Sequence, residues 1–500
     1  MTGDLTLAID VGTGSVRAAL VDDRGTIRAI AAREQQQIVP TFGWAEQRPQ
    51  DWWDGVGAAI REVLAAEPEA ARRVVAVAAC GQMHGTVLVD SDGALTRPTA
   101  PLWNDKRTAA LVTAFERDHA PADYLYGSGN PATPAWPGFK LAWLRDHDPE
   151  AYRRAAAVLM PKDYVNFRLT GAMAMDPGDA SCSFLMDPET GQWSARMIAE
   201  LGLDAAKLPP IRSCLDVLGL VTTSAAADTG LRKGTPVLVG GADYPMALYG
   251  SGACRTGLAS DVTGTSCIIT AIADKPVLDP EVCNVATIEG HWGPFVLLET
   301  GGDAMRWARR AFFDNAVGYD HLTAEAAKAR PGADGLLFMP YLTGERLGRH
   351  RNARAQFFGL GAAHGMPELQ RAILEGVAFA AARHMRIMEQ AIGRPVERVI
   401  ASGGGAKGAL WLKIKASIYG VPIVVPSEAE CGLVGCAALA QTALGRHGSL
   451  TAAADALVSF AEEVAPDPSW AEHYARMQPI FDRLYRHSQE FYADLDALIA

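Results

Sequence analysis

The sequence has no apolar run that approaches the roughly 20 residues needed to cross a bilayer. Its opening, MTGDLTLAID, lacks both a basic region and a long apolar stretch, so we expect no export signal, no membrane partner and a cytoplasmic location. Positive charge is also scarce, with 46 Lys and Arg against 57 Asp and Glu and a net charge of −11. Because an acidic surface repels phosphate backbones, nucleic acid is not an expected partner.

The eight cysteines show neither a metal-binding nor a disulfide pattern. None forms C-x-x-C, and none lies at zinc-site spacing from a nearby histidine. This pattern predicts buried, reduced thiols. The chain also has no low-complexity tract and no G-x-x-x-x-G-K-[ST] sequence, which excludes a P-loop.

What remains is the composition of a globular protein, with 49% hydrophobic and 21% charged residues. A chain of 500 residues is too long for one ordinary core, so we expect at least two domains. A candidate boundary at 231–236 precedes an apolar run. It predicts domains at 1–234 and 235–468, with a helical tail at 469–500 that packs back on the first domain.

Both halves alternate short apolar runs, typical of strands, with segments of helical spacing. In the first half we expect strands at 5–10, 16–21, 27–32, 74–80 and 86–89 and a helix at 50–66. In the second half we expect strands at 236–240, 259–263, 267–273, 398–401 and 422–425 and helices at 367–392 and 410–419. The order predicts an α/β fold built on mixed sheets.

A short pattern occurs in both halves. Asp10-Val-Gly-Thr-Gly-Ser15 resembles Asp261-Val-Thr-Gly-Thr-Ser266, and each joins two predicted strands through glycine and hydroxyl residues. Two such turns would offer backbone N–H groups and hydroxyls to one polyphosphate. Short echoes of this composition also arise by chance, so the repeat is a hypothesis at this point.

The first of these turns has the residue types that a phosphate site needs. Glycine lets a backbone approach phosphate closely, Thr13 and Ser15 supply hydroxyl donors, and Arg17 supplies a counter-charge. Asp10, at the end of the preceding strand, suits a Mg²⁺ shell. The alternatives are an ordinary hairpin turn and a turn-forming aspartate.

Asp243 follows the apolar run 237–241, and ligand sites in open α/β sheets lie at the carboxyl ends of strands. It is therefore a candidate to accept a proton from a substrate hydroxyl in phosphoryl transfer, and to share a metal with Asp10. The alternative is that Asp243 caps the helix that Pro245 begins.

Two polar clusters beside apolar strands, Gln82-Met83-His84-Gly85 and 101–107, offer the amide, imidazole and aromatic groups that suit a sugar. Taken alone, His84 and Trp103 are more often core residues. A rival signal is Gly403-x-Gly405-x-x-Gly408, which matches a dinucleotide fingerprint with Glu428 near the ribose-binding spacing. The same glycines could instead hold the adenosine end of ATP.

Together these segments resemble the FGGY family of carbohydrate kinases, and its xylulokinases most. The shared pieces run in family order over roughly residues 5–440. They are IDVGTGSVRAAL at the start, GQMHG at 81–85, LWNDKR at 102–107, PKDY at 161–164, GGAD at 240–243, GTS at 264–266, MPYLTGER at 339–346, QFFGL at 356–360 and SGGGAKGALW at 402–411.

The resemblance implies two actin-like (ribonuclease H-like) ATPase domains with ATP in the cleft between them. It implies Asp243 as the catalytic base, Asp10 beside Mg²⁺, and Met83 and His84 in contact with a ketose. It also places Trp103, Asn104 and Asp105 on the sugar side, and Thr13, Gly264, Thr265, Gly302, Gly404 and Gly405 around ATP.

One departure concerns the sugar. Xylulokinases usually have Asn after the catalytic aspartate, in contact with the sugar, whereas this chain has Tyr244. Because Tyr is much bulkier, it would reshape the pocket. The sequence therefore predicts an ATP-dependent kinase of a ketopentose, with D-xylulose (giving D-xylulose 5-phosphate, as in xylose metabolism) favoured and Tyr244 among the substrate contacts.

Three alternatives remain open. The first is an FGGY kinase for another ketose or polyol, such as ribulose, an erythritol-like polyol or a deoxy sugar. The second is an actin- or chaperone-type ATPase with a protein client, and the third is an NAD-dependent dehydrogenase built on 403–408. Analogy alone suggests a homodimer.

Overall fold

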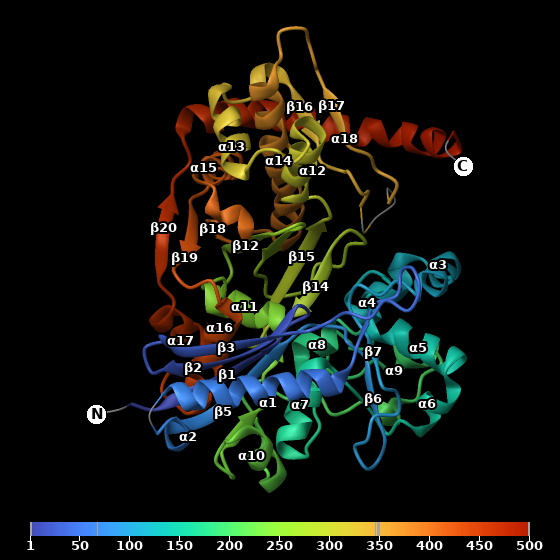
Figure 1. The fold of residues 1–500 in the computed structure, drawn as a ribbon. Helices are drawn as coiled ribbons and strands as arrows, with labels where there is room; N and C mark the ends of the chain where they lie inside the picture. Colours follow the sequence, from blue (N-terminus) through green and yellow to red (C-terminus); the bar gives the residue numbers. More distant parts are fainter. Residues whose placement is uncertain (1–2, 68, 346, 348–350, 499–500) are drawn as a thin grey trace. The chain divides into compact units, whose positions relative to one another are not determined.

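The computed structural model describes residues 3–67, 69–345, 347 and 351–498 (Figure 1). The chain divides into two compact units, each assembled from separate segments. The first unit comprises Met1–Cys254, Asp274–Gly293 and Glu430–Val458, and the second comprises Arg255–Ala273, Pro294–Ala429 and Ser459–Ala500. No helix among the described residues has the length and apolar character needed to span a bilayer.

The central sheet of the first unit begins with three antiparallel strands, as the sequence predicted. Strands β1 (Leu5–Val11), β2 (Ser15–Asp22) and β3 (Ile27–Glu34) pair in order, and β1 also pairs in parallel with β5 (Val74–Gly81). The order β3-β2-β1-β5 continues with β10 (Pro236–Leu238) and β9 (Val217–Leu220), while β11 (Gly241–Ala242) pairs with β5.

The two faces of this sheet are covered by different helices. Successive side chains of a strand point to opposite faces. Leu7 and Ile9 belong to one core with the apolar face of α1 (Pro49–Ala66). Ala8 lies in a second core with α16 (Cys431–Ala443).

Helices α11 (Asp243–Ser251) and α16 meet through glycine. A β-carbon on Gly250 would lie 1.7 Å from the carbonyl oxygen of Cys431, and one on Gly435 would lie 2.1 Å from that of Met246. Real β-carbons never come so close, so the two backbones pack directly on each other. This contact fixes α11, whose first residue is Asp243.

The remaining elements of the first unit are short. They are β4 (Glu46–Gln47), α2 (Ala70–Arg73), β6 (Val87–Val89), β7 (Ala100–Pro101), α3 (Ala109–Asp118), α4 (Pro121–Ser128), α5 (Pro137–His147), α6 (Pro149–Arg154), β8 (Ala157–Leu159), α7 (Pro161–Thr170), α8 (Pro177–Ser181), α9 (Ala195–Glu200), the 3₁₀ helix η1 (Ala205–Lys207), α10 (Thr223–Thr229), β14 (Cys283–Ala286) and α17 (Leu450–Leu457).

The second unit has its own sheet, in which the strands run in the order β15-β13-β12-β18-β19-β20. Strands β12 (Leu258–Thr263) and β13 (Cys267–Ala271) form an antiparallel hairpin, and β12 pairs in parallel with β18 (Arg398–Ser402). Each unit therefore contains a hairpin next to a parallel strand, which confirms the echo between residues 10–15 and 261–266 as a structural repeat.

Helices pack against the second sheet. Among them is α14 (Met366–Ile392), whose buried side chains share a core with those of the sheet. The other elements are β15 (Trp292–Leu298), α12 (Asp303–Phe313), α13 (Tyr319–Lys328), the 3₁₀ helices η2 (Ala333–Gly335) and η3 (Gly404–Lys407), β16 (Leu337–Met339), β17 (Gln356–Phe358), α15 (Ala409–Tyr419), β19 (Ile423–Pro426), β20 (Phe460–Val464) and α18 (Pro468–Ala497). Residue 346, which closes the motif at 339–346, lies outside the described residues.

Two features of the predicted domain division differ from the structure. Residues 235–254 belong to the first unit, because β10 and β11 extend its sheet. The terminal helix α18 belongs to the second unit and not, as expected, to the first. Its buried aromatic side chains explain this, since the rings of Phe481 and Tyr474 lie 5.6 and 5.7 Å from that of Phe379 on α14.

Candidate active site

Two carboxylates leave the carboxyl ends of strands on either side of β5. Asp10 on β1 is the register partner of Cys80, which also pairs with Gly241 on the opposite side. Asp243 follows β11 directly and begins α11. Two strand spacings separate the backbones of β1 and β11, roughly 10 Å in all, so both side chains lie at one edge of the sheet.

Burial and mutual repulsion make these two acids hard to ionise together. Burial raises the pKa of Asp243 to about 7, with a smaller contribution from the charge of Asp10 and opposition from the Tyr244 N–H. Burial likewise raises the pKa of Asp10 to about 6, where Arg17 opposes the shift and Glu430 adds to it. Oxygen donors held this way suit Mg²⁺, which favours one or two carboxylates and would offset their repulsion.

Arg17 lies among carboxylates. Its guanidinium Nη1 is 2.6 Å from Glu430 Oε2 and 3.5 Å from Asp10 Oδ2. This pairing favours a role in holding Asp10 over the predicted direct contact with phosphate. Ser15, the other predicted donor of this hairpin, begins β2 and is half-buried.

A chain of side-chain hydrogen bonds joins the glycine-rich turn to the predicted sugar loops. Thr13 Oγ1 donates to Gln82 Oε1 at 2.9 Å and accepts from Trp103 Nε1 at 3.1 Å. Gln47 Nε2 donates to the Thr13 carbonyl at 2.7 Å, and its Oε1 accepts from Gln82 and from Trp52. The predicted phosphate turn and the predicted sugar side are therefore one connected structure within the first unit.

Met83 and His84 occupy the tight turn after β5. Met83 is buried, and His84 has a positive φ of 67°, which is unusual for a residue with a β-carbon. The His84 ring meets Trp136 edge-on at 4.9 Å. Its carbonyl oxygen accepts from Lys140 Nζ at 2.9 Å and from Thr86 Oγ1 at 3.2 Å.

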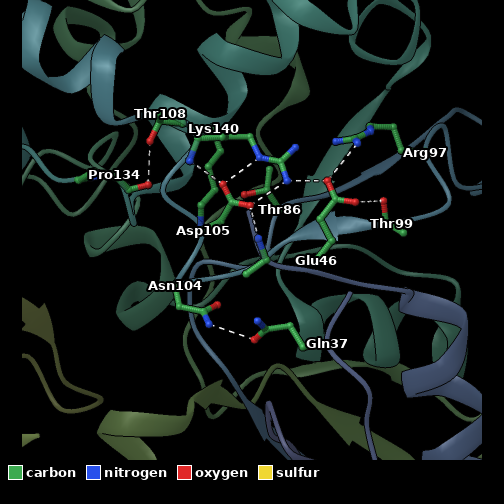
Figure 2. A network of polar contacts seen from close by, with 12 residues as sticks. Gln37, Glu46, Thr86, Arg97, Thr99, Asn104, Asp105, Thr108, Pro134 and Lys140 are labelled. Atoms are coloured by element: carbon green, nitrogen blue, oxygen red, sulfur yellow. Dashed lines mark hydrogen bonds and ion pairs between the residues drawn. The ribbon is translucent and has the colours of Figure 1, made fainter. Parts of the chain in front are cut away.

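The next predicted sugar residues, 103–105, differ in exposure, and Figure 2 shows the polar contacts of Asn104 and Asp105. Trp103 is 38% exposed, and Asn104 Nδ2 donates to Gln37 Oε1 at 3.0 Å. Asp105 is buried, and its carboxylate accepts from the Ala45 N–H and from the Arg107 backbone and guanidinium. Because the protein itself supplies these donors, the geometry favours a structural role for Asp105 over the predicted sugar contact.

A buried ion cluster supports the strand that precedes Asp243. Asp176 Oδ1 accepts from the Ala242 N–H at 3.3 Å, and its Oδ2 lies 2.7 Å from Lys162 Nζ. Asp163 and Asp179 also contact Lys162. The three carboxylates are close enough to hold a metal ion, but the Lys162 ammonium already lies among them. Only the segment 161–164 of this cluster had been singled out in the sequence, as part of a motif.

The predicted ATP residues of the second unit gather at the ends of its strands. The turn after β12 exposes Gly264 and Thr265. Backbone hydrogen bonds run from Gly302 N to Gly264 O at 2.9 Å and from Asp303 N to Thr265 O at 3.0 Å, which ties the start of α12 to this turn. Glycine at 302 is required, since its β-carbon would lie 2.4 Å from the Gly264 carbonyl oxygen.

The glycine run 403–405 leaves the same sheet edge, because β18 pairs with β12 with Ser402 opposite Val262. Gly403 has a φ of 78° and opens the turn. Gly404 is exposed, and a β-carbon at this position would meet no other atom within 4 Å. The structure thus brings together Gly264, Gly302 and Gly404, which are far apart in sequence.

Asp261, the counterpart of Asp10, is placed differently. Its carboxylate is fully buried and receives Lys415 Nζ at 2.8 and 3.0 Å, Thr263 Oγ1 at 2.6 Å and Tyr419 Oη at 2.8 Å. Burial alone would raise the pKa of Asp261, but Lys415 and the hydrogen bonds lower it below its usual value. This acid is therefore neutralised by the protein, whereas the counter-charge beside Asp10, Arg17, lies farther away at 3.5 Å.

Several contributors were not predicted. Gln47, Lys140 and Lys415 carry no local signal, because each acts on a residue at least 34 positions away in sequence. Gln82 lies in a quoted motif, yet its link to Thr13 could not be read from spacing. All eight cysteines are free and buried, as predicted.

Comparison with known proteins identifies the family of the chain. Residues 5–250 match the N-terminal domain of the FGGY family of carbohydrate kinases, and residues 259–444 match its C-terminal domain. Xylulose kinase of Escherichia coli is 31% identical over 96% of this chain and 98% of its own length. A gluconokinase of Bacillus subtilis is 27% identical over 98% of this chain and 97% of its own length.

A solved structure gives the same result for the fold. The crystal structure of xylulose kinase from Rhodospirillum rubrum matches with a TM-score of 0.92 and 30% identity, covering 98% of this chain and 100% of that one. These matches extend over both units. The chain belongs to the FGGY family of carbohydrate kinases and is an ATP-dependent sugar kinase.

Proposed function

We propose that this kinase phosphorylates a ketopentose, with D-xylulose favoured and D-xylulose 5-phosphate as product. The observation that carries the proposal is the pair formed by Asp10 and Asp243 at the ends of strands flanking β5. The relatives named as xylulose kinases support the sugar, while the gluconokinase relative makes an aldonic acid the second candidate.

In this proposal Asp243 is the general base. A carboxylate with a pKa of about 7 accepts a proton more readily than an ordinary aspartate, and it is partly unprotonated at neutral pH. As the terminal sugar hydroxyl attacks the γ-phosphorus, its proton passes to Asp243. The new O–P bond forms while the bond to the ADP oxygen breaks.

The other predicted residues take matching roles. Asp10 and Asp243 would hold Mg²⁺, which would supply positive charge to offset that of the phosphates. Met83, His84, Trp103 and Asn104 would contact the sugar, and Ser15 would donate to a phosphate oxygen. Thr13 would do the same by exchanging its hydrogen bond to Gln82 for one to phosphate. In the second unit, the nucleotide would be bound by Gly264, Thr265, Gly302, Gly404 and Gly405.

The test is a substrate panel with coupled ADP detection. It should contain D-xylulose, ribulose, erythritol, a deoxy sugar and gluconate, together with a sample without sugar. The highest kcat/KM on D-xylulose would support the proposal. A higher kcat/KM on gluconate or a polyol would overturn D-xylulose as the substrate. ATP turnover that is independent of sugar would favour the ATPase alternative. The prediction of a homodimer stays a separate question for light scattering.

Tyr244→Asn should change the order in which the panel sugars are used. Tyr244 follows the proposed base on α11, and its side chain is half-buried, so its bulk limits the space beside that base. We expect the shift to be about tenfold or more between two sugars, since even one extra or missing methylene in a pocket alters discrimination by roughly 10–200-fold. The measurement is kcat/KM for each sugar.

Tyr244→Phe is the matched control, because it removes the hydroxyl and keeps the ring. If bulk sets selectivity, the Phe variant should keep the wild-type order. If Tyr244→Phe shows the same altered order of sugars as Tyr244→Asn, loss of the hydroxyl is responsible. Identical rankings in all three proteins would remove Tyr244 from the selectivity of the site.

A further inference from the structure

Lys140 is a buried cation with no role in the proposed chemistry. It lies on α5, where its side chain is removed from solvent, and its ammonium donates a 2.9 Å hydrogen bond to the carbonyl oxygen of His84. Charged groups are rarely buried in this way unless they are paired. The contact reaches across 56 residues to one backbone atom.

The residue that Lys140 contacts is in a strained conformation. His84 has a φ of 67°, which costs free energy for any residue with a β-carbon and persists only where neighbours enforce it. Two contacts hold its carbonyl, from Lys140 and from the Thr86 hydroxyl, while Trp136 packs against its ring. The direction of the imidazole therefore depends on the bond at the carbonyl.

Lys140 has one acid, Asp105, and one further cation, Arg107, among the charges that act on it. Burial lowers the pKa of Lys140 to about 7, Asp105 opposes this shift, and Arg107 adds to it. Asp105 is largely committed to Arg107, which also pairs with Glu46 at 2.6 Å (Figure 2). The ammonium is thus only partly compensated by the acids of this network.

We propose that Lys140 is a positioning residue that fixes the imidazole of His84 toward the sugar by holding the His84 carbonyl. This inference rests on the proposed function, because it takes His84 as a sugar contact. Lys140 itself touches neither the sugar nor the nucleotide. Its effect is on sugar affinity and not on the proton transfer at Asp243.

The proposal has a pH consequence with a definite sign. A lysine is charged below its pKa, and a hydrogen bond from a charged donor is roughly twice as strong as one from a neutral donor. Above pH of about 7 the ammonium loses its proton, so its hold on His84 weakens. The KM for the sugar should therefore rise between pH 6 and 8.

The experiment compares Lys140→Met with wild type on the preferred sugar. We expect KM for the sugar to rise about tenfold, with KM for ATP and kcat little changed, because the lost bond is to a charged donor. The ratio of variant to wild-type KM should also fall between pH 6 and 8, because Asp10 and Asp243 titrate in both proteins and only the contribution of Lys140 is lost. Lys140→Arg keeps a permanent charge and should partly restore affinity while removing the pH dependence. Lys233→Met, at an exposed lysine, should change nothing.

His84→Ala distinguishes a failure of the proposed sugar site from a failure of the proposed role of Lys140. If no sugar is turned over, or if His84→Ala leaves KM for the sugar unchanged, the assignment of the sugar site fails and the inference fails with it. If His84→Ala raises KM but Lys140→Met does not, the proposed function stands and the inference is overturned. A Lys140→Met protein that melts earlier and loses kcat as well would show a merely structural role.

Discussion

Asp243→Asn is expected to reduce kcat by a factor of ~10²–10⁴, the range over which a positioned general base contributes. Asn has the same shape as Asp but cannot take the proton of the attacking hydroxyl. KM for ATP should stay close to the wild-type value, because most of the proposed nucleotide contacts are in the second unit. The measurement is steady-state ADP release, together with ATP binding by calorimetry.

The same substitution should stabilise the fold at neutral and alkaline pH. The pKa of Asp243 is raised from 3.8 to about 7, so the folded protein binds this proton more tightly than the unfolded chain does. The charged carboxylate therefore destabilises the folded state above pH of about 7. This penalty fades as pH falls toward 4. Melting curves in EDTA should show Asp243→Asn above wild type at pH 8, with the gap narrower at pH 5 and closed only near pH 4.

The control is Asp23→Asn at an exposed position, which should alter neither turnover nor melting. Wild-type turnover in Asp243→Asn would remove Asp243 from the role of base. A variant that loses turnover and also melts earlier than wild type at pH 8 would contradict the electrostatic account of this site.

Lys415→Met should destabilise the second unit by about 3–5 kcal/mol, the usual cost of removing one partner from a buried ion pair. Lys415 and Asp261 are both fully buried, and Lys415 Nζ also donates to Thr263 Oγ1 at 2.7 Å. Without the ammonium, Asp261 would be a buried charge with only neutral donors, the hydroxyls of Thr263 and Tyr419 and the thiol of Cys267. Denaturant unfolding, followed in the second unit through Trp411 beside Lys415, measures the loss.

Two further variants test the cause. Lys413→Met, on the same helix, breaks a partly exposed pair with Asp467 and should cost less than about 1 kcal/mol. Asp261→Asn combined with Lys415→Met removes both charges and should recover part of the loss. A Lys415→Met protein as stable as Lys413→Met would refute the claim that buried Asp261 depends on the Lys415 ammonium for its stabilisation.

The pH dependence of this pair has the opposite sign to that of Asp243. The folded-state pKa of Asp261 is lowered, so its stabilising contribution is present above the unfolded value of 3.8 and is lost as pH falls below it. Asp10 and Asp261, which occupy equivalent places in the repeat, thus differ in the charges that surround them. Asp261 is neutralised by Lys415, whereas Asp10 has a raised pKa and faces Asp243.

Local patterns predicted most of the fold. The helix expected at 50–66 is Pro49–Ala66, and the one expected at 367–392 is Met366–Ile392, because apolar spacing and flanking Pro and Gly residues define both. The predicted domain boundary at 234 did not describe the two units, because segments 274–293 and 430–458, later in the chain, belong to the first unit. Such returns depend on tertiary packing that no local pattern encodes.

The candidate site shows the same division. Asp10 and Asp243 were predicted because strand ends next to glycine are visible in sequence. The contacts that changed the interpretation of other residues were not predicted. Arg107 and Ala45 donate hydrogen bonds to Asp105, and Lys140 donates one to His84 from α5, and no local sequence pattern indicates these contacts. The resemblance to a family identified the candidate residues, and the structure added which of them already have hydrogen-bond partners within the protein.

The glycine contact between α11 and α16 limits how this protein can vary. Even alanine at Gly250 or Gly435 would force the two helices apart, and Asp243 begins one of them. In a saturation mutagenesis library, both codons should therefore tolerate almost no replacement, although neither residue touches a substrate. Directed evolution toward new sugars would have to proceed through the loop around Trp103 and the side chain of Tyr244, because the backbones of this helix pair have no room to adapt.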